Sequence, residues 1–338
     1  MNDKFFPDSY NCVVILGPTA VGKTGVGVGV ADYYDGQIIS ADSRQVYKGL
    51  DIGSGKDLDE YILNKGTSKE KKIPYHLIDN ADVKNEYNVF NYQKDFYKVF
   101  TELQSKNILP VIVGGTGMYL DSIVRGYDLI EVPTNHELRK ELAGKSEIEL
   151  TQILSELKNK VGNKLHNSTD ITERHRLLRA IEIEIFTQEK KSNPQLNNYR
   201  NSSDEKMPER PDIKPIIIGT TFERCVLREN VTKRLKQRLQ EGMIEEVESI
   251  HNSGISWERL ERLGLEYRFV SEFLQGKILS ENELFEKLNT AIHQFVKRQE
   301  TWFRGMERKG VKIFWLNRDV KTKETRVQQV VDYINSLK

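Results

Sequence analysis

Short runs of β-branched and other apolar residues, each bounded by turn-forming residues, recur along the chain. Runs of this length and composition are typical of strands that are buried on both faces, as in a parallel sheet. The predicted strands are Cys12–Leu16, Gln37–Ile39, Tyr75–Ile78, Val111–Val113, Ile216–Ile218 and Ile313–Leu316.

Helical patterns separate several of these strands. Phe96, Val99, Phe100 and Leu103, for example, fall on one stripe at three- and four-residue spacing. Strands that alternate with amphipathic helices predict an α/β fold, in which helices flank a mainly parallel sheet.

Between Pro133 and Gln188 the strand pattern stops. Charged amphipathic segments at His136–Leu142 and Thr172–Phe186 replace it and predict a small all-helical insertion. The polar stretch Lys190–Arg210 then predicts a loop that returns the chain to the core.

The remainder of the chain is predicted to be mostly helical. Arg224–Arg308 has a helical pattern with a break around Asn252–Gly254, and Thr322–Leu337 is predicted to form the last helix. We therefore expect a core of residues 1–130 and 206–338, interrupted by a helical domain over residues 131–205.

The segment Gly17-Pro18-Thr19-Ala20-Val21-Gly22-Lys23-Thr24 fits the GxxxxGK[ST] pattern of phosphate-binding loops. It follows a predicted strand and precedes a helical segment, which are the two contexts that the motif requires. Backbone N–H groups, the helix N-terminus and Lys23 would bind phosphate oxygens, and Thr24 would ligate Mg²⁺. We therefore expect a core like that of P-loop NTPases, a diphosphate or triphosphate ligand held by this whole segment, and Mg²⁺ as the cofactor.

Gly25, Gly27 and Gly29 alternate within the helix that begins at this loop. Glycine costs a helix interior about 1 kcal/mol relative to alanine. Close packing between this helix and the sheet is the reason that we expect for them.

Composition narrows the class of protein. The formal net charge is +1, which does not by itself indicate a nucleic-acid binder, although an even balance can conceal a basic face. Cys12 and Cys225 have no cysteine–histidine cluster at zinc spacing around them, and we expect both to be reduced packing residues.

The sequence contains no apolar run of membrane-spanning length and no signal-peptide pattern. We expect a cytoplasmic protein without a membrane partner, and we expect it to be a monomer.

The second predicted strand runs into an acidic turn, Ser40–Gly53, in which Asp42 stands at the carboxyl end of the strand. In open α/β sheets that edge faces the ligand crevice. Asp42 is therefore a candidate general base, and capping of the following turn is its structural alternative.

At this point the sequence resembles the tRNA dimethylallyltransferase family, also called tRNA isopentenyltransferases. The shared motifs are the GPTxxGKT loop at Gly17–Thr24, a DSxxxYKGxDIG stretch within Asp42–Lys56, HLID at His76–Asp79, GGTGxY at Gly114–Tyr119, RHRLLRAIEI at Arg174–Ile183 and KRQETWFR at Lys297–Arg304.

The sequence departs from the family pattern in two places. Gly53–Asp57 reads GSGKD where the family has GTAKP, and Gly264–Arg268 reads GLEYR where the family usually has GYR or GYK. These departures leave the exact RNA and prenyl substrates open.

The resemblance implies transfer of a dimethylallyl group from dimethylallyl diphosphate to N6 of adenine 37, beside the anticodon of tRNA. It implies that Asp42 removes a proton from the amine, which is a weak nucleophile. Thr19, Lys23 and Arg224 would stabilise the leaving diphosphate together with Mg²⁺.

The expected RNA partner is the tRNA anticodon stem-loop, and two groups of residues are expected to contact it. The first would bind RNA phosphates and comprises Arg139, Arg174, Arg176, Lys297 and Arg304, with further cations in the run Lys233–Arg238. The second would bind the turned-out nucleotide and comprises Asp42, Ser43, Arg44, Gln45 and Thr116.

Three other function classes are open at the level of sequence. An adenylate prenyltransferase would share the fold and the chemistry but modify a free nucleotide. An ATP-dependent small-molecule kinase would use the phosphate loop but leave the other motifs unexplained. A non-catalytic RNA-binding module would lose no function when Asp42 is replaced.

Overall fold

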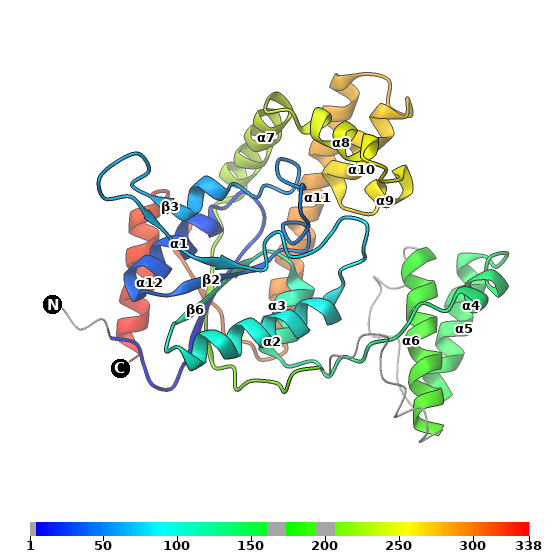
Figure 1. Ribbon diagram of the computed structural model, residues 1–338, viewed down its shortest axis with the longest axis horizontal. Coiled ribbons are helices and arrows are strands. Elements are labelled where there is room, and N and C mark those ends of the chain that lie inside the picture. The colour runs from blue at the N-terminus through cyan, green and yellow to red at the C-terminus, as the bar shows by residue number, and fades with distance from the viewer. Residues whose placement is uncertain (1–4, 161–173, 193–206, 338) are drawn as a thin grey trace. The chain divides into compact units, whose positions relative to one another are not determined.

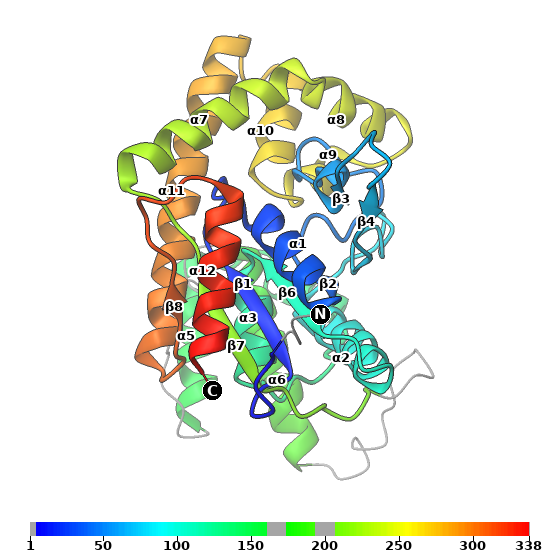
Figure 2. The same ribbon diagram turned by 90° about the vertical axis from the view of Figure 1, so that its left-hand side faces the viewer.

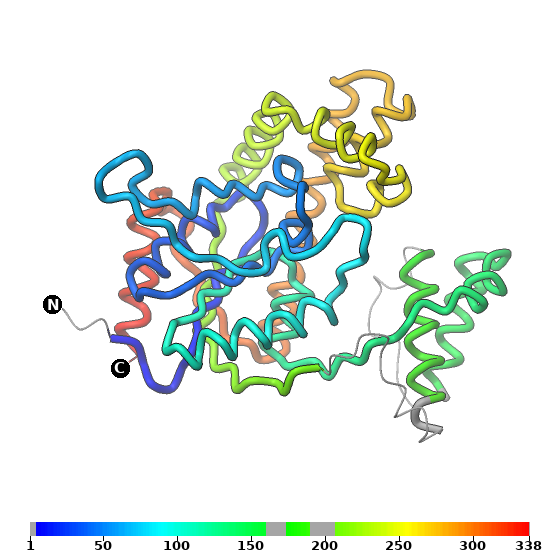
Figure 3. The backbone as a smooth tube through the Cα atoms, in the orientation of Figure 1, coloured from blue at the N-terminus to red at the C-terminus, as the bar shows by residue number. Residues whose placement is uncertain are grey.

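The computed structural model describes residues 5–160, 174–192 and 207–337. The chain divides into two compact units, one formed by Met1–Tyr127 with Pro208–Lys338 and the other by Asp128–Met207. The smooth trace in Figure 3 lets the reader follow the chain out of the larger unit and back into it. Of the loop expected at Lys190–Arg210, residues 193–206 lie outside the described residues.

The larger unit is built on a six-stranded sheet in which each pair of neighbouring strands is parallel, in the order β5-β2-β6-β1-β7-β8 (Figure 1). The predicted α/β fold with its parallel sheet is therefore confirmed. The strands are β1 (Cys12–Leu16), β2 (Gln37–Ala41), β5 (Tyr75–His76), β6 (Pro110–Gly114), β7 (Pro215–Gly219) and β8 (Phe314–Trp315). A separate antiparallel pair, β3 (Ile62–Leu63) with β4 (Lys71–Lys72), was not predicted, because two residues carry no periodicity.

Helices cover both faces of this sheet. On one face, α1 (Lys23–Tyr34) and α12 (Lys323–Ser336) pack side by side over alternate strand residues such as Val13 and Ile15, as Figure 2 shows. On the other face lie α2 (Val89–Ser105) and its neighbour α3 (Gly117–Val124). The Asn88 side chain begins α2 by accepting the N–H groups of Phe90 and Asn91.

The region predicted as one long helical segment with a break around Asn252–Gly254 has that break and three more, at 241–242, 262–264 and 275–280. Gly242 and Gly264 stand at two of these breaks with positive φ, where glycine avoids the steric cost of a side chain. The helices are α7 (Arg224–Gln240), α8 (Met243–Asn252), α9 (Trp257–Glu261), α10 (Leu265–Leu274) and α11 (Glu281–Arg308).

One apolar core joins these C-terminal helices to the turn that carries the acidic motif. Val46, Tyr47 and Leu50 of that turn are buried against Leu227 and Leu260 of the helices. Because burying such side chains contributes about 1.5–3 kcal/mol each, the helices fix the position of the acidic turn.

Over residues 128–160 and 174–192, the smaller unit forms helices and loops without a strand and has a core of its own. Its helices are α4 (His136–Glu141), α5 (Glu147–Lys160) and α6 (Arg174–Ser192). Leu150 and Leu154 of α5 pack against Leu177 and Ile181 of α6.

The two cysteines differ in their surroundings. Cys12 is buried in β1, and this burial raises the pKa of its thiol. Cys225 is exposed, so the prediction that it packs in the core was wrong. It lies off the buried stripe of α7, which is made by Leu227, Val231 and Leu235. None of the helices in the described part of the chain is long and apolar enough to cross a membrane.

Close packing accounts for two of the alternating glycines in α1. A Cβ atom on Gly27 would lie 2.3 Å from Val113 Cγ2 of β6, and one on Gly29 would lie 2.5 Å from Val327 Cγ2 of α12. Both distances are shorter than real Cβ contacts. The helix therefore lies so close to the sheet and to α12 that these two positions have no room for a side chain. A Cβ atom on Gly25 would make an ordinary 3.4 Å contact with the Lys323 side chain.

We predict that Gly27→Ala destabilises the protein. Overpacking costs roughly 1–3 kcal/mol, and better helix propensity returns about 1 kcal/mol, which leaves a net loss of up to about 2 kcal/mol. Urea unfolding measures the change in the free energy of unfolding. Gly25→Ala is the matched control and should keep or slightly raise the stability; equal effects of the two substitutions would contradict this packing.

Candidate functional site

The strand register brings four loops to one edge of the sheet. Leu16 at the end of β1 is level with Gly114 of β6 and Gly219 of β7, and Ala41 of β2 is also level with Gly114. The residues that follow these four ends are Gly17, Gly115, Thr220 and Asp42. The phosphate loop, the acidic turn and the GGTG turn therefore begin side by side, as the α/β fold requires of a ligand site.

The phosphate loop has a conformation suited to an anion. Ala20 and Gly22 both have positive φ, at 62° and 69°, on either side of Val21. Alternation of left-handed and right-handed residues turns successive backbone N–H groups to one side, which forms an anion-binding concavity. α1 begins at Lys23, within the last two residues of the loop motif, and the Lys23 ammonium donates to the Pro18 carbonyl at 2.6 Å.

Asp42 lies at the start of the acidic turn, directly after β2. Its Oδ1 accepts the N–H groups of Arg44 at 2.9 Å and Gln45 at 3.4 Å, so the carboxylate caps the turn and is held in one orientation. Thr116 of the GGTG turn accepts the N–H of Ser43 at 3.0 Å, which joins the two turns. The charge of Asp42 also acts on Lys23 of the phosphate loop.

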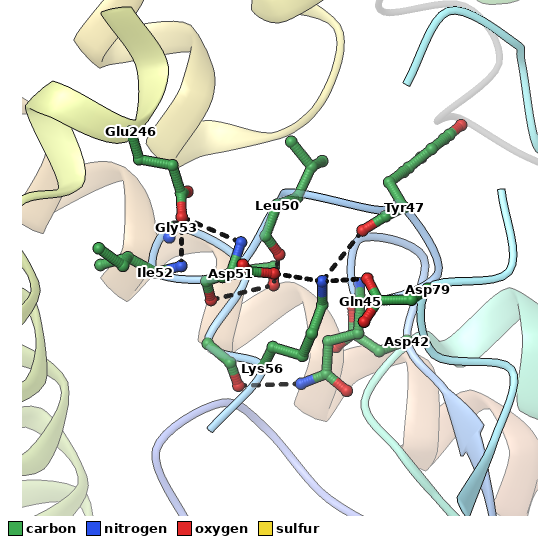
Figure 4. A network of polar contacts seen from close by, with 12 residues as sticks. Asp42, Gln45, Tyr47, Leu50, Asp51, Ile52, Gly53, Lys56, Asp79 and Glu246 are labelled. Carbon is green, nitrogen blue, oxygen red and sulfur yellow. Dashed lines mark hydrogen bonds and ion pairs between the residues drawn. The ribbon is translucent and has the colours of Figure 1, made fainter. Parts of the chain in front are cut away.

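A buried lysine anchors the far end of the acidic turn (Figure 4). Lys56 donates to the Tyr47 carbonyl at 3.1 Å and to one oxygen each of Asp51 and Asp79, both at 2.5 Å. Asp79 is the aspartate of the HLID motif. Lys56 therefore binds two of the sequence motifs to one another.

A carboxylate from the C-terminal helices holds the same turn (Figure 4). Glu246 of α8 accepts the backbone N–H groups of Asp51, Ile52 and Gly53 at 3.0, 2.6 and 3.1 Å. Tyr267, which belongs to the unusual GLEYR element, donates its hydroxyl to the same carboxylate at 2.9 Å. Sequence reasoning missed Glu246, because its partners lie nearly two hundred residues away in the chain.

The amide of Gln45 is used within the acidic turn. Its Nε2 donates to the Gly55 carbonyl at 3.0 Å, and its Oε1 accepts from the Ser40 hydroxyl at 3.2 Å. The expectation that Gln45 contacts the nucleotide stays a prediction. The observed bonds give it a second role in shaping the turn.

Gln299 connects the phosphate loop to the GGTG turn. Its Oε1 accepts the N–H of Thr19 at 3.0 Å, and its Nε2 donates to the Gly115 carbonyl at 2.9 Å. Gln299 belongs to the KRQETWFR motif, which was interpreted only as an RNA-binding face. A signal was present, because Gln299 continues the apolar stripe of Ile292 and Val296 and is buried with it. A polar residue in an apolar stripe indicates a specific internal partner.

Arg234 of α7 contacts the phosphate loop. Its Nη1 donates to the Thr19 hydroxyl at 3.2 Å. Arg224, which was assigned to the diphosphate, is exposed at the first residue of α7. Geometry favours Arg234 over Arg224 for that role. Sequence reasoning placed Arg234 only within a run of RNA-binding cations.

The GSGKD segment, Gly53–Asp57, which departs from the family pattern, lies against Arg234. Asp57 forms an ion pair with Arg238 and lies 3.9 Å from Arg234. A Cβ atom on Gly55 would overlap the Arg234 guanidinium, at 1.8 Å from Nη2. The departure therefore leaves room for Arg234 and supplies it with a nearby carboxylate.

Sequence-family profiles match almost the whole of this arrangement. The profile described as IPP transferase matches residues 45–306, and the profile described as Isopentenyl transferase matches residues 10–70. The chain belongs to the IPP transferase family.

Relatives within the IPP transferase family are similar over most of their length. The chain is 50% identical to tRNA dimethylallyltransferase 2 of Treponema denticola over 309 residues, which cover 91% of this chain and 96% of the relative. It is 45% identical to tRNA dimethylallyltransferase 2 of Phocaeicola vulgatus over 329 residues, which cover 97% and 99%. The solved tRNA isopentenylpyrophosphate transferase of Bacillus halodurans is 27% identical, with a TM-score of 0.64 and 96% coverage of each chain.

The RNA-contact residues expected for the IPP transferase family divide into two groups. Lys297 and Arg304 are exposed on α11. In the smaller unit, Arg139 forms a two-bond pair with Glu182, and Arg174 donates to the carbonyls of Leu142 and Ala143. Arg139 and Arg174 therefore stabilise the helical unit itself, and their contact with RNA stays a prediction.

Burial shapes the charges around the phosphate loop. Burial, together with the positive charge of Arg234, lowers the pKa of Lys23 to about 8. Burial also raises the pKa of Glu266, in the GLEYR element, where the charges of Arg234, Arg44 and Asp42 act on it. Glu266 is a carboxylate of this IPP transferase site that sequence reasoning did not single out.

We predict that diphosphate affinity falls as pH rises through 8. Above this pH the ligand-free Lys23 has lost its proton, and binding an anion requires that the proton be regained. The affinity for methyl diphosphate, whose own ionisation is complete below pH 8, should fall about tenfold for each pH unit above 8. Titration calorimetry from pH 7 to 9.5 measures this, and Lys23→Arg, which stays protonated, should remove the fall. A flat profile in the unsubstituted protein would exclude Lys23 as the titrating group.

Proposed function

We propose that this chain transfers the dimethylallyl group of dimethylallyl diphosphate to N6 of adenine 37, beside the anticodon of tRNA, and releases diphosphate. The observation that carries the proposal is the level sheet edge at which the phosphate loop and Asp42 begin, separated only by β6. A diphosphate site and a carboxylate next to it are the two elements that this reaction needs. Membership of the IPP transferase family supports the same reaction.

The donor binds with its diphosphate in the phosphate loop, Gly17–Thr24. Loop N–H groups, the Lys23 ammonium and the Arg234 guanidinium beside Thr19 surround the leaving group. Cations and N–H donors that are already in place stabilise the negative charge that develops on the leaving oxygen. Arg234 takes the role that the sequence alone assigned to Arg224.

Mg²⁺ fits this site as an ion held together with the diphosphate. In the described part of the chain, no group of three or more His, Cys, Asp or Glu side chains could hold a metal on its own. Mg²⁺ typically uses few protein ligands and completes its shell with phosphate oxygens and water. The Thr24 hydroxyl, on the first turn of α1, would be the protein ligand. The ion would neutralise charge on the diphosphate.

Asp42 acts as the base toward the acceptor. The adenine amine is a weak nucleophile because its lone pair is delocalised into the ring. As N6 attacks the allylic carbon, a carbon–nitrogen bond forms and the carbon–oxygen bond to diphosphate breaks, and Asp42 takes the N6 proton. The N–H groups of Arg44 and Gln45 hold Oδ1, and we assign the proton to Oδ2.

The RNA lies along the exposed basic residues of α11. Lys297 and Arg304 are seven residues apart and share one face of that helix. Cations on such a face can follow a phosphate backbone, while the target adenine is turned outward to reach the buried site. The helical unit adds a second docking surface through Arg176 and its neighbours. We also propose that the protein acts as a cytoplasmic monomer.

Replacement of the base tests the proposal most simply. Asp42→Asn should lower turnover by roughly 10²-fold or more and leave tRNA affinity nearly unchanged, because it removes proton transfer without removing an RNA phosphate contact. Mass spectrometry of tRNA and release of pyrophosphate measure the reaction, and Asp319→Asn is the control. Prenylated AMP without modified tRNA would indicate the adenylate enzyme, ADP release would indicate a kinase, and full activity of Asp42→Asn would exclude Asp42 as the base.

The RNA face has a test of its own. Lys297→Ala and Arg304→Ala should weaken tRNA binding and reduce the slope of log affinity against log salt by about one each, while donor binding stays unchanged. Lys287→Ala on the same helix, where Lys287 pairs with Glu283, is the matched control. Unchanged salt slopes would remove this face of α11 from the interface.

A further inference from the structure

Arg326 of α12 is a buried arginine that donates hydrogen bonds to the phosphate loop. The residue is only 2% exposed. Nη1 donates to the carbonyl of Val21, inside the loop, at 2.7 Å. Nη2 donates to the Thr220 hydroxyl and, at 3.2 Å, to the Thr221 carbonyl. The guanidinium also stands 4.3 Å from the centre of the Phe222 ring.

The acceptors of Arg326 are neutral. They are two carbonyls and a hydroxyl, and Nε has no hydrogen-bond partner among the described residues. Burial lowers the pKa of this guanidinium to about 10, which leaves it charged at neutral pH. A buried cation that is not paired with an anion is costly to a fold. The anion that would offset this cost is the one that the phosphate loop binds.

The contact with Val21 fixes the direction of a peptide group. In a trans peptide the C=O and the following N–H point in opposite directions. Since the Val21 carbonyl points at Arg326, the N–H of Gly22 points away from it, toward the opposite side of the loop. Val21 stands between Ala20 and Gly22, which both have positive φ. The hydrogen bond from Arg326 therefore holds the peptide group in the part of the loop whose backbone conformation is least common.

Arg326 reaches the beginning of the loop as well. Gly17 packs so tightly on Thr220 that a Cβ atom on Gly17 would lie 2.1 Å from the Thr220 carbonyl oxygen. Arg326 holds the Thr220 side chain and the Val21 carbonyl at once. One guanidinium thus links Val21, within the phosphate loop, to Thr220, which packs against the first residue of the loop.

We propose that Arg326 is a positioning residue for the prenyl diphosphate: it aims the Gly22 N–H at the diphosphate and adds a fixed positive charge behind the loop. The inference rests on the proposed function of the loop. It also brings the C-terminal helix into the site, although Arg326 lies outside both segments that match the family profiles, 10–70 and 45–306.

The test compares two replacements of Arg326 with a matched control. Arg326→Gln removes the charge, and Arg326→Lys keeps it but loses the two-pronged geometry. Arg318→Gln, on an exposed side chain earlier in the C-terminal segment, is the control. For each variant, calorimetry gives the dissociation constant for dimethylallyl diphosphate, steady-state kinetics separates KM from kcat, and a thermal melt gives Tm.

Arg326→Gln should weaken dimethylallyl diphosphate binding about tenfold or more and raise KM for the donor, with tRNA affinity within about twofold of the original. Arg326→Lys should lie between, and Arg318→Gln should match the unsubstituted protein. A lower Tm with unchanged donor affinity in the folded protein would overturn the proposal, since a merely structural arginine predicts that result. Should Arg326→Gln fail to fold, Arg326→Lys decides by the same readouts.

Lys23→Met separates this inference from the proposed function. If Lys23→Met weakens donor binding and the Arg326 variants do not, the inference is wrong and the proposed function stands. If none of these variants changes donor binding, the loop is not the donor site, and both fail.

Discussion

The parallel register of β2, β6, β1 and β7 is the constraint on which the site depends. Strands that pair in parallel and end at the same level deliver the loops that follow them to one edge. Here the level residues are Ala41, Gly114, Leu16 and Gly219. The phosphate loop and Asp42 therefore begin at the same edge, one on each side of the GGTG turn that follows β6. A shift of one residue in the β1–β6 pairing or in the β6–β2 pairing would separate the leaving group from the base.

The loops at this edge are held by polar groups that come from distant parts of the chain. Gln299 joins the phosphate loop to the GGTG turn, Glu246 accepts backbone N–H groups of the acidic turn, and Arg326 donates to a backbone carbonyl of the phosphate loop. Each of these side chains satisfies backbone groups that would otherwise be left unpaired in a partly buried loop. The C-terminal helices thus shape a site whose recognisable motifs lie mostly in the N-terminal half. Preorganisation of this kind is what electrostatic stabilisation of a leaving group requires.

The sequence predicted the elements of the fold better than the contacts between them. The strands were found because β-branched runs such as Cys12–Leu16 carry a strong local signal, and the phosphate loop was found because its motif needs a strand before it and a helix after it. Arg234 shows the limit: which arginine of α7 contacts Thr19 depends on how that helix lies against the loop, and periodicity does not encode this. Glu246 and Arg326 were missed because most of their partners are backbone groups, which carry no sequence signal. Gln299 could have been found as a polar residue in an apolar stripe.

If the proposed function is correct, the phosphate loop holds the donor with its reactive carbon beside Asp42. A crystal structure with dimethylallyl S-thiolodiphosphate, a slowly reacting analogue of the donor, tests it most directly. We expect diphosphate oxygens within hydrogen-bond distance of Lys23 Nζ and the Gly22 N–H, and the allylic carbon on the side of the Asp42 carboxylate. A diphosphate bound away from Gly17–Thr24, or an allylic chain that points away from Asp42, would contradict it.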